Sequence, residues 1–276
     1  MIFTNPPVLA MTDADLEPAS LWQEELAKAD TVAAVDKLLR YATPLACDAT
    51  KAPSATRALL PRRIGGAMMV WRRIRPEVEA GAIRNRIDYW LRLRANDMVK
   101  TFDTLHWGNN LDAAGAMAVY ATGDALDDDK LRKAGLRIAG RVLANIDPDG
   151  FTVEIKRPDN QKKAKDAAEY YSHETMIYLV ALAGMVPSMW GDAAIKRAGA
   201  LLDADLGTGA RYAAKTGHKQ IAYPSAAPGP IPSGFLGRWM PAFLAQYGSE
   251  GYPNLARAAA YYDANPARMF NATIGG

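Results

Sequence analysis

Apolar residues recur at intervals of three and four along almost the whole of this 276-residue chain. One run comprises Ile83, Ile87, Trp90, Leu91 and Met98, and such spacing puts apolar side chains on one face of an α-helix. Further helices are predicted at 19–42, 62–75, 111–122, 131–146, 174–186, 192–204, 235–248 and 253–263. Alternating β-branched residues are nearly missing outside "GFTVEI" (150–155), where a short extended piece is predicted. The pattern indicates an all-α fold.

Short connections between the predicted helices favour antiparallel helix pairs, which can pack as a bundle, an α-solenoid or an α/α toroid. No repeat of fixed period is visible, which disfavours the solenoid. Two long polar or proline-rich interruptions, 47–63 and 207–234, are predicted to be functional lids, binding loops or disordered segments. No linker divides the chain, so we expect one domain over 1–276, with 1–18 as an extended N-terminal segment.

Composition limits the partners that this chain can have. A net charge of +3 and a pI of about 8.8 are far from the clustered excess of a nucleic-acid binder, but they are compatible with an acidic ligand. The single cysteine, Cys47, excludes an intrachain disulfide and a multi-cysteine metal site. The modest net charge predicts no nucleic-acid partner. No apolar run could span a bilayer and no leader is visible, so no membrane partner is expected. The compartment stays open: periplasm or secretion would follow if a leader had been removed, and the oligomeric state is not predicted.

Motifs for metal and cofactor binding are absent from the sequence. There is no H-E-x-x-H, no Asp-rich calcium loop, no phosphate-binding glycine loop and no G-x-S-x-G. The acidic run "DALDDDK" (124–130) is predicted to start a helix, because acidic side chains favour a helix N-terminus. We therefore expect neither a metal nor a cofactor.

The stretch "HWGNN" (106–110) directly precedes an alanine-rich predicted helix. Asparagine is a favoured N-cap, because its side-chain oxygen accepts from the unpaired amides of the first turn. One asparagine is sufficient for capping, so either Asn109 or Asn110 requires another partner.

A second polar stretch, 149–184, carries Lys156 and Arg157 and then the sequence Tyr-Tyr-Ser-His at 170–173. Two of the three histidines of the chain, His106 and His173, fall within these two stretches. The third, His218, lies in a loop with glycine and lysine and is a weaker candidate.

Asparagine, arginine, tyrosine and histidine together suit β-elimination on a uronic-acid polymer. The proton to be removed lies next to a carboxylate and is very weakly acidic while that carboxylate keeps its charge. Asparagine and arginine can hydrogen-bond the carboxylate and stabilise the enolate-like intermediate. A tyrosinate or a neutral histidine can take the proton, and a tyrosine hydroxyl can protonate the leaving oxygen.

Three stretches resemble the alginate lyase family, polysaccharide lyase family 5. Asn109 and Asn110, with the alanine-rich stretch and "ATGD" after them, resemble the Asn-Asn-His motif of the family. "DPDGFTVEIKR" (147–157) resembles its "D-x-x-G-F-L-P-x-E-L-K-R" segment, and "YYSHETMIYLVALA" (170–183) resembles its "Y-H-N-Y" stretch. Fainter similarity runs from about residue 30 to residue 248. The resemblance implies an incomplete α/α toroid with a deep cleft.

The resemblance also implies roles for individual residues. Asn110 and Arg157 would neutralise the substrate carboxylate, and Tyr171 would act as base and acid. Leu111 stands where the family has a histidine, so His173 or His106 would supply an imidazole, or Tyr171 would work alone on one face of the sugar. The longer stretch between Arg157 and the tyrosines makes Tyr170 a rival for the role of Tyr171.

Further side chains are candidates for substrate binding. This set comprises Asn109, His106, Trp107, Lys156, Tyr170, Arg62, Arg63 and Trp239. Trp107, Trp239 and Tyr178 could stack on sugar rings, although aromatic residues at helical spacing also suit a core. Arg62 and Arg63 could hold uronate carboxylates as a lid closes, or form a solvated basic pair.

The leading hypothesis is therefore a lyase that cleaves an anionic polysaccharide, such as alginate or polyglucuronate, by β-elimination. A polysaccharide-binding protein without activity is a second possibility. A glycoside hydrolase on a similar toroid is a third, and it would need two facing carboxylates from among Glu154, Glu169 and Glu174.

Overall fold

The computed structural model describes residues 31–41, 54–156, 165–220 and 237–264. Within these ranges there are ten α-helices, three short 3₁₀ helices and no β-strand. The α-helices are α2 (Thr31–Tyr41), α3 (Ser54–Ile74), α4 (Ala82–Leu105), α5 (Asn110–Ala125), α6 (Asp129–Ala144), α8 (Ala168–Met185), α9 (Ala193–Asp205), α10 (Ala210–Thr216), α12 (Met240–Tyr247) and α13 (Pro253–Ala264). The 3₁₀ helices are η3 (Arg75–Glu77), η4 (Val153–Lys156) and η6 (Pro187–Gly191). The predicted all-α class is confirmed, and the toroid stays a prediction.

The chain forms two compact units. The first comprises 1–107 and 114–138, and the second comprises 108–113 and 139–276. The division falls inside α5 and α6, so each of these helices contributes to both units. The prediction of a single domain is not decided by this division, and the segment 1–18 lies outside the described residues.

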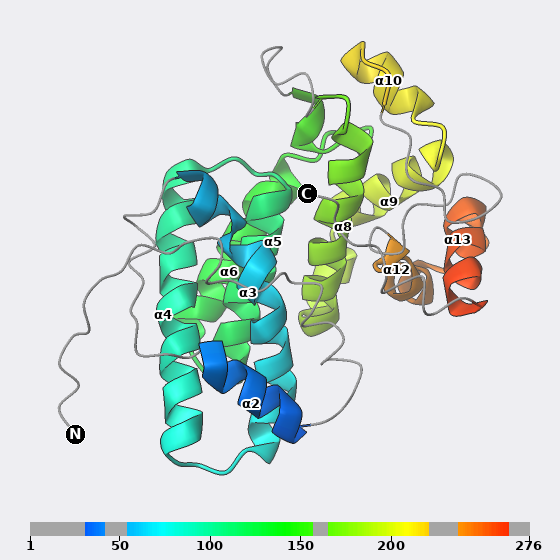
Figure 1. Cartoon of the computed structure of the whole chain (residues 1–276). Helices are drawn as coiled ribbons and strands as arrows, with labels where there is room; N and C mark the ends of the chain where they lie inside the picture. The colour runs from blue at the N-terminus through cyan, green and yellow to red at the C-terminus, as the bar shows by residue number, and fades with distance from the viewer. Residues whose placement is uncertain (1–30, 42–53, 157–164, 221–236, 265–276) are drawn as a thin grey trace. The chain divides into compact units, whose positions relative to one another are not determined.

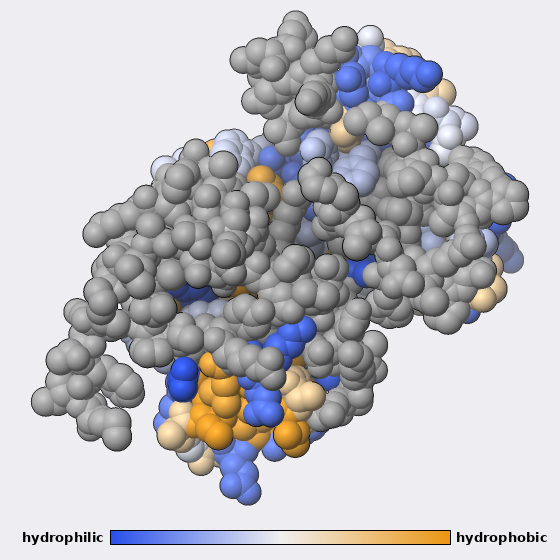
Figure 2. Space-filling view, in the orientation of Figure 1, coloured by the Kyte–Doolittle hydropathy of each residue, from blue (hydrophilic) through white to orange (hydrophobic). Residues whose placement is uncertain are grey.

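In the first unit α3, α4, α5 and α6 pack side by side, and α2 packs against α3 and α4 (Figure 1). Small residues allow the close approach: Gly115 of α5 lies against the ring of Phe102 in α4. The carboxylate of Asp88 in α4 accepts from the indole nitrogen of Trp71 at 2.7 Å and pairs with Arg75 at 2.9 Å. Hydrophobic atoms gather on the surface over α2, where Val32 is 73% exposed (Figure 2).

The second unit is built around α8, which packs against α9, α12, η4 and η6. Helix α13 packs against α9 and α12, and α10 packs against α9 and η4. The ring of Phe243 in α12 meets those of Trp239, Tyr247 and Tyr252 with centroids 4.7 to 5.2 Å apart. Gly199 leaves room for Phe243, because a Cβ at that position would lie 2.2 Å from the ring.

The predicted loop at 47–63 is wrong in part, because α3 already begins at Ser54 and continues through Pro61. The two prolines of this stretch indicate a break, but Pro53 precedes the helix and the alanines, leucines and arginines that follow are good helix formers. Residues 42–53 lie outside the described residues.

Two further predictions of local structure are corrected. Within the predicted loop 207–234, residues 210–216 form α10, whose first amides donate to the carboxylate of Asp205 at 3.0 Å. The predicted extended piece at 150–155 contains the start of η4. Its β-branched residues favour a strand, but the described part of the chain offers no partner strand, and a local turn bond from Ile155 to Thr152 forms instead.

The contact between α5 and α6 in the first unit should be intolerant of added volume. A Cβ at Gly135 would lie 2.8 Å from the backbone nitrogen of Tyr120 and 2.9 Å from the carbonyl oxygen of Ala116, and neither atom can move independently of α5. We expect Gly135→Ala to lower the free energy of unfolding by about 1–3 kcal/mol in urea denaturation.

Gly140→Ala is the matched control in the same helix. A Cβ at Gly140 would meet nothing within 4 Å, so the higher helix propensity of alanine should raise the free energy of unfolding by up to about 1 kcal/mol. Equal effects of the two substitutions would contradict the close helix contact.

Candidate functional site

The two asparagines at the start of α5 have different partners. Asn109 is the N-cap, because its Oδ1 accepts from the backbone nitrogens of Leu111 at 3.0 Å and Asp112 at 3.3 Å. The capping prediction is confirmed for Asn109. Gly108 sets the entry to the helix: it has a φ of +64°, and a Cβ there would collide with the side-chain amide of Asn145.

Asn110 turns instead toward α8. Its Nδ2 donates to Oε2 of Glu174 at 2.7 Å, and the hydroxyl of Tyr178 donates to Oε1 of the same carboxyl group at 3.4 Å. Asn110 is 1% exposed and Glu174 is 2% exposed. A polar contact so well shielded from water is held in one geometry, because each broken hydrogen bond would leave an unsatisfied buried group.

His173 of α8 is completely buried beside Trp239. The indole Nε1 of Trp239 donates to Nδ1 of His173 at 3.3 Å, and since an indole nitrogen can only donate, the proton of the neutral imidazole lies on Nε2. Burial lowers the pKa of His173 to about 3, so the ring is neutral at physiological pH. It can donate from Nε2, and its Nδ1 lone pair is already engaged. The burial of Trp239 favours the core position for its indole over stacking on a sugar.

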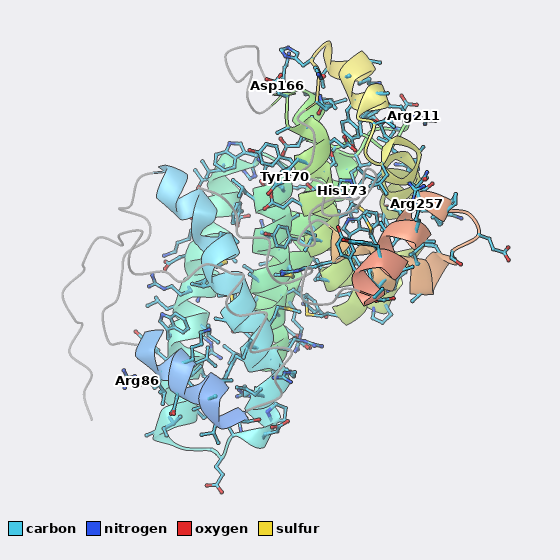
Figure 3. The ribbon with its side chains drawn as sticks, turned by 45° about the vertical axis from the view of Figure 1, so that its right-hand side comes forward. Arg86, Asp166, Tyr170, His173, Arg211 and Arg257 are labelled. Atoms are coloured by element: carbon cyan, nitrogen blue, oxygen red, sulfur yellow. The ribbon has the colours of Figure 1, made fainter. Side chains whose placement is uncertain are left out.

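The adjacent tyrosines occupy the first turn of α8. Tyr170 and Tyr171 are half-buried and form an edge-to-face pair with centroids 5.5 Å apart. Tyr170 and His173 lie one turn apart on the same helix (Figure 3). Helix α8 therefore brings both candidate tyrosines close to the buried His173 and Glu174.

A cation, Arg238, lies close to this cluster. Burial lowers the pKa of Arg238 to about 10, and its electrostatic interaction with Tyr178 opposes that shift. Nε and Nη1 of the guanidinium are buried. Arg238 therefore places a positive charge near the phenol that donates to Glu174.

The other predicted site residues lie in the first unit, at an exposed position or outside the described residues. His106 and Trp107 belong to the first unit and are exposed, Trp107 by 37%. Lys156 is exposed at the end of η4. Arg157 lies outside the described residues. Arg62 and Arg63 lie in α3, and their side chains also lie outside the described set.

The three glutamates considered for a hydrolase are all buried. Both carboxyl oxygens of Glu174 accept hydrogen bonds within the protein, which disfavours a role as a free acid or base. Glu169 lies beside Gly209 and Gln220, and the side chain of Gln220 accepts from its backbone nitrogen at 3.2 Å. The weaker histidine candidate, His218, pairs through Nδ1 with Asp166 at 3.0 Å.

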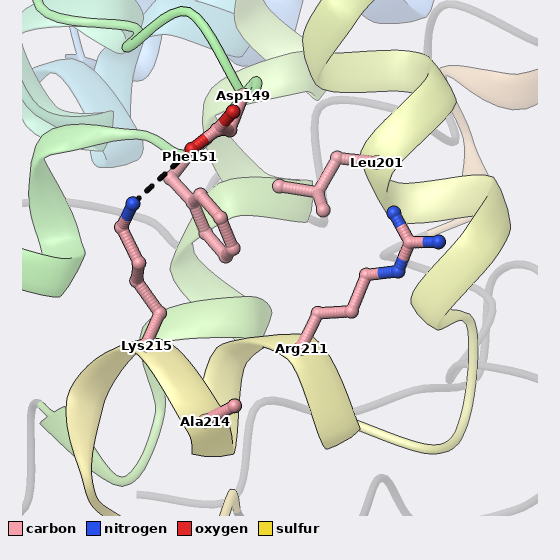
Figure 4. Close-up of a pocket in the computed structure, with 6 residues that line it drawn as sticks. All are labelled: Asp149, Phe151, Leu201, Arg211, Ala214 and Lys215. Atoms are coloured by element: carbon pink, nitrogen blue, oxygen red, sulfur yellow. Dashed lines mark hydrogen bonds and ion pairs between the residues drawn. The ribbon is translucent and has the colours of Figure 1, made fainter.

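An open pocket of about 440 Å³ lies elsewhere in the second unit, lined by Asp149, Phe151, Leu201, Arg211, Ala214 and Lys215 (Figure 4). Lys215 lines the pocket next to two other lining residues: its Nζ lies 3.2 Å from the carboxylate of Asp149 and 5.0 Å from the centroid of the Phe151 ring. None of the residues predicted from the sequence to bind or transform a substrate lines this pocket.

Among the described residues, no group of three or more histidine, cysteine, aspartate or glutamate side chains is arranged to hold a metal ion. No helix in the same part of the chain combines the length and apolar character that crossing a membrane requires.

A family model described as Alginate lyase matches residues 72–192. Over this segment the chain is similar to the alginate lyase family. The matched segment includes Asn110, Tyr171 and Glu174, whereas Trp239 and Arg238 lie beyond it. No curated protein matches the chain. Because alginate is an anionic polysaccharide, the similarity indicates a ligand of that class.

Sequence reasoning considered Glu174 only as a hydrolase carboxylate and missed its contact with Asn110. Spacing within α8 offered one signal, since Glu174 lies three and four residues after the tyrosines and therefore on the same side of the helix. The contact to Asn110 joins residues 64 apart, which no local pattern reveals.

The buried imidazole of His173 predicts a pH dependence of the stability of this protein. The unfolded chain takes up a proton at His173 near pH 6.5, whereas the folded chain does so only near pH 3. Stability is therefore lost as the pH falls from 6.5 toward 3, by up to about 1.4 kcal/mol per pH unit from this group.

Urea unfolding at neutral and mildly acidic pH would measure this loss. His173→Gln retains an acceptor for the indole of Trp239 and should flatten the pH dependence, whereas His106→Gln, at an exposed position, should not. An unchanged slope in His173→Gln would refute the assignment.

Proposed function

We propose that this protein is a polyuronate lyase that cleaves the 1,4-glycosidic bond of an alginate-like or glucuronan-like polysaccharide by β-elimination. The observation that carries the proposal is the Asn110 amide, which is held beside the tyrosine-bearing helix α8 inside the segment that matches the family model. An amide and a phenol on neighbouring elements are the donor and the acid–base group that the reaction needs.

In the proposed reaction, Asn110 and Arg157 hydrogen-bond the uronate carboxylate. The phenolate form of Tyr171 removes the proton from the carbon next to that carboxylate, and the electron pair forms a double bond to the neighbouring carbon. The bond from that carbon to the glycosidic oxygen breaks, and the oxygen takes the proton that the Tyr171 hydroxyl now carries. The product is an unsaturated uronic acid at the new non-reducing end.

His173 enters this scheme as a neutral group. Its pKa near 3 and its engaged Nδ1 argue against a role as the base, since the remaining nitrogen already carries the proton. We therefore assign the proton transfers to Tyr171, with Tyr170 as the rival. His173 can support the site as a hydrogen-bond donor.

Leucine stands at position 111, where the family that the chain resembles has a histidine. This difference favours one alternative, a polysaccharide-binding protein that does not cleave its ligand. Ultraviolet absorbance of the unsaturated product separates the two functions. We expect absorbance to rise with one of polymannuronate, polyguluronate, polyglucuronate or pectate. Binding without any rise in absorbance would establish the alternative.

Arg157→Ala should lower turnover at least about 100-fold on the polymer that is cleaved, the scale on which loss of one charge-stabilising donor acts. Lys156→Ala, at the exposed neighbouring position, is the comparison for a general loss of positive charge. Turnover close to wild type in Arg157→Ala would remove this residue from the mechanism.

Tyr171→Phe removes a single hydroxyl group, and we expect it to abolish measurable elimination while leaving thermal unfolding nearly unchanged. Tyr170→Phe is the matched control on the same helical turn. If Tyr170→Phe is the inactive variant and Tyr171→Phe keeps its turnover, the two assignments must be exchanged.

A further inference from the structure

Glu174 connects the asparagine motif to the helix that carries the tyrosines. Its Oε2 accepts from Asn110 at 2.7 Å, its Oε1 accepts from Tyr178 at 3.4 Å, and all three residues are buried in the second unit. One carboxyl group thus fixes the start of α5 against the middle of α8.

Glu174 lies on the same side of α8 as the two candidate tyrosines and Tyr178. Residues three and four apart lie on the same side of a helix, so Glu174 follows Tyr171 and Tyr170 by about one turn and precedes Tyr178 by another. The spacing between the Asn110 amide and the tyrosines is therefore set through the carboxyl group of Glu174.

The hydrogen bond also fixes how the Asn110 amide is turned. With one N–H directed at Glu174, the directions of the second N–H and of Oδ1 are determined. Oδ1 is buried and accepts no hydrogen bond in the part of the chain that the structure describes. A hydroxyl of a bound sugar could donate to this carbonyl oxygen and satisfy it.

We propose that Glu174 is a positioning residue for the lyase reaction, holding the Asn110 amide in the orientation in which it meets the polysaccharide. This inference rests on the proposed function. It assigns Glu174 no contact with the substrate: the carboxyl group acts through Asn110.

The test is a double-mutant cycle on elimination. Glu174→Met keeps the side-chain volume and removes the acceptor, and it should lower kcat/KM on the order of 100-fold, the cost of misplacing one group in a catalytic site. Glu174→Gln retains an acceptor oxygen and should restore most of the activity. In the Asn110→Ala background, Glu174→Met should cause no further loss, because the group it positions is already gone.

Leu179→Ala, at a buried position on the same helix, is the stability control: it should lower the thermal unfolding midpoint without changing kcat. A merely structural Glu174 would behave like Leu179, and its effect would persist in the Asn110→Ala background. Glu174→Ala provides a second removal of the acceptor if Glu174→Met does not fold.

The outcomes separate this inference from the proposed function. If the wild-type protein eliminates and Glu174→Met keeps its kcat/KM, the positioning role alone is overturned. If the wild type binds a polyuronate without cleaving it, the same cycle is measured on the calorimetric Kd, and additive losses overturn the role. A wild type that neither cleaves nor binds any polymer of the panel refutes both proposals.

Discussion

The burial of α8 on nearly every side is the constraint on which the second unit depends. A helix surrounded by protein has little water to satisfy its polar side chains, so these side chains need partners within the protein. Glu174 finds Asn110, Ser172 bonds Thr152 at 2.7 Å, and His173 bonds Trp239. These contacts connect α5, the residue before η4 and the N-cap of α12 to one helix.

Much of the fold could be predicted from the sequence, because helical periodicity depends only on local spacing. The runs at 83–98, 111–122 and 192–204 correspond closely to α4, α5 and α9. Local signals failed where they had two meanings. Gly209 and Gly217 indicate a loop, but they are the two caps of α10. Pro61 indicates a break, but it lies inside the continuous helix α3. In both cases the helix-forming residues between the breakers decide the structure.

The candidate site was predictable in its residue types more than in its connections. The sequence picks out Asn110, His173 and the tyrosines because amides, imidazoles and phenols suit one reaction. The burial of His173 and Trp239 could not be read from the pattern, since an aromatic residue at helical spacing suits both a core and a binding surface. Only the packing of α12 against α8 distinguishes the two.

The sequence separation of Asn110 and Glu174 has a consequence for the order of folding. Helices α5 and α8 can each form from local contacts, but the hydrogen bond between them closes a loop of more than sixty residues and must await the docking of distant elements. We therefore expect the helices to form before the hydrogen bond that orients the Asn110 amide. During refolding, or after partial unfolding by denaturant, the helical content of this protein is a poor guide to the integrity of its site.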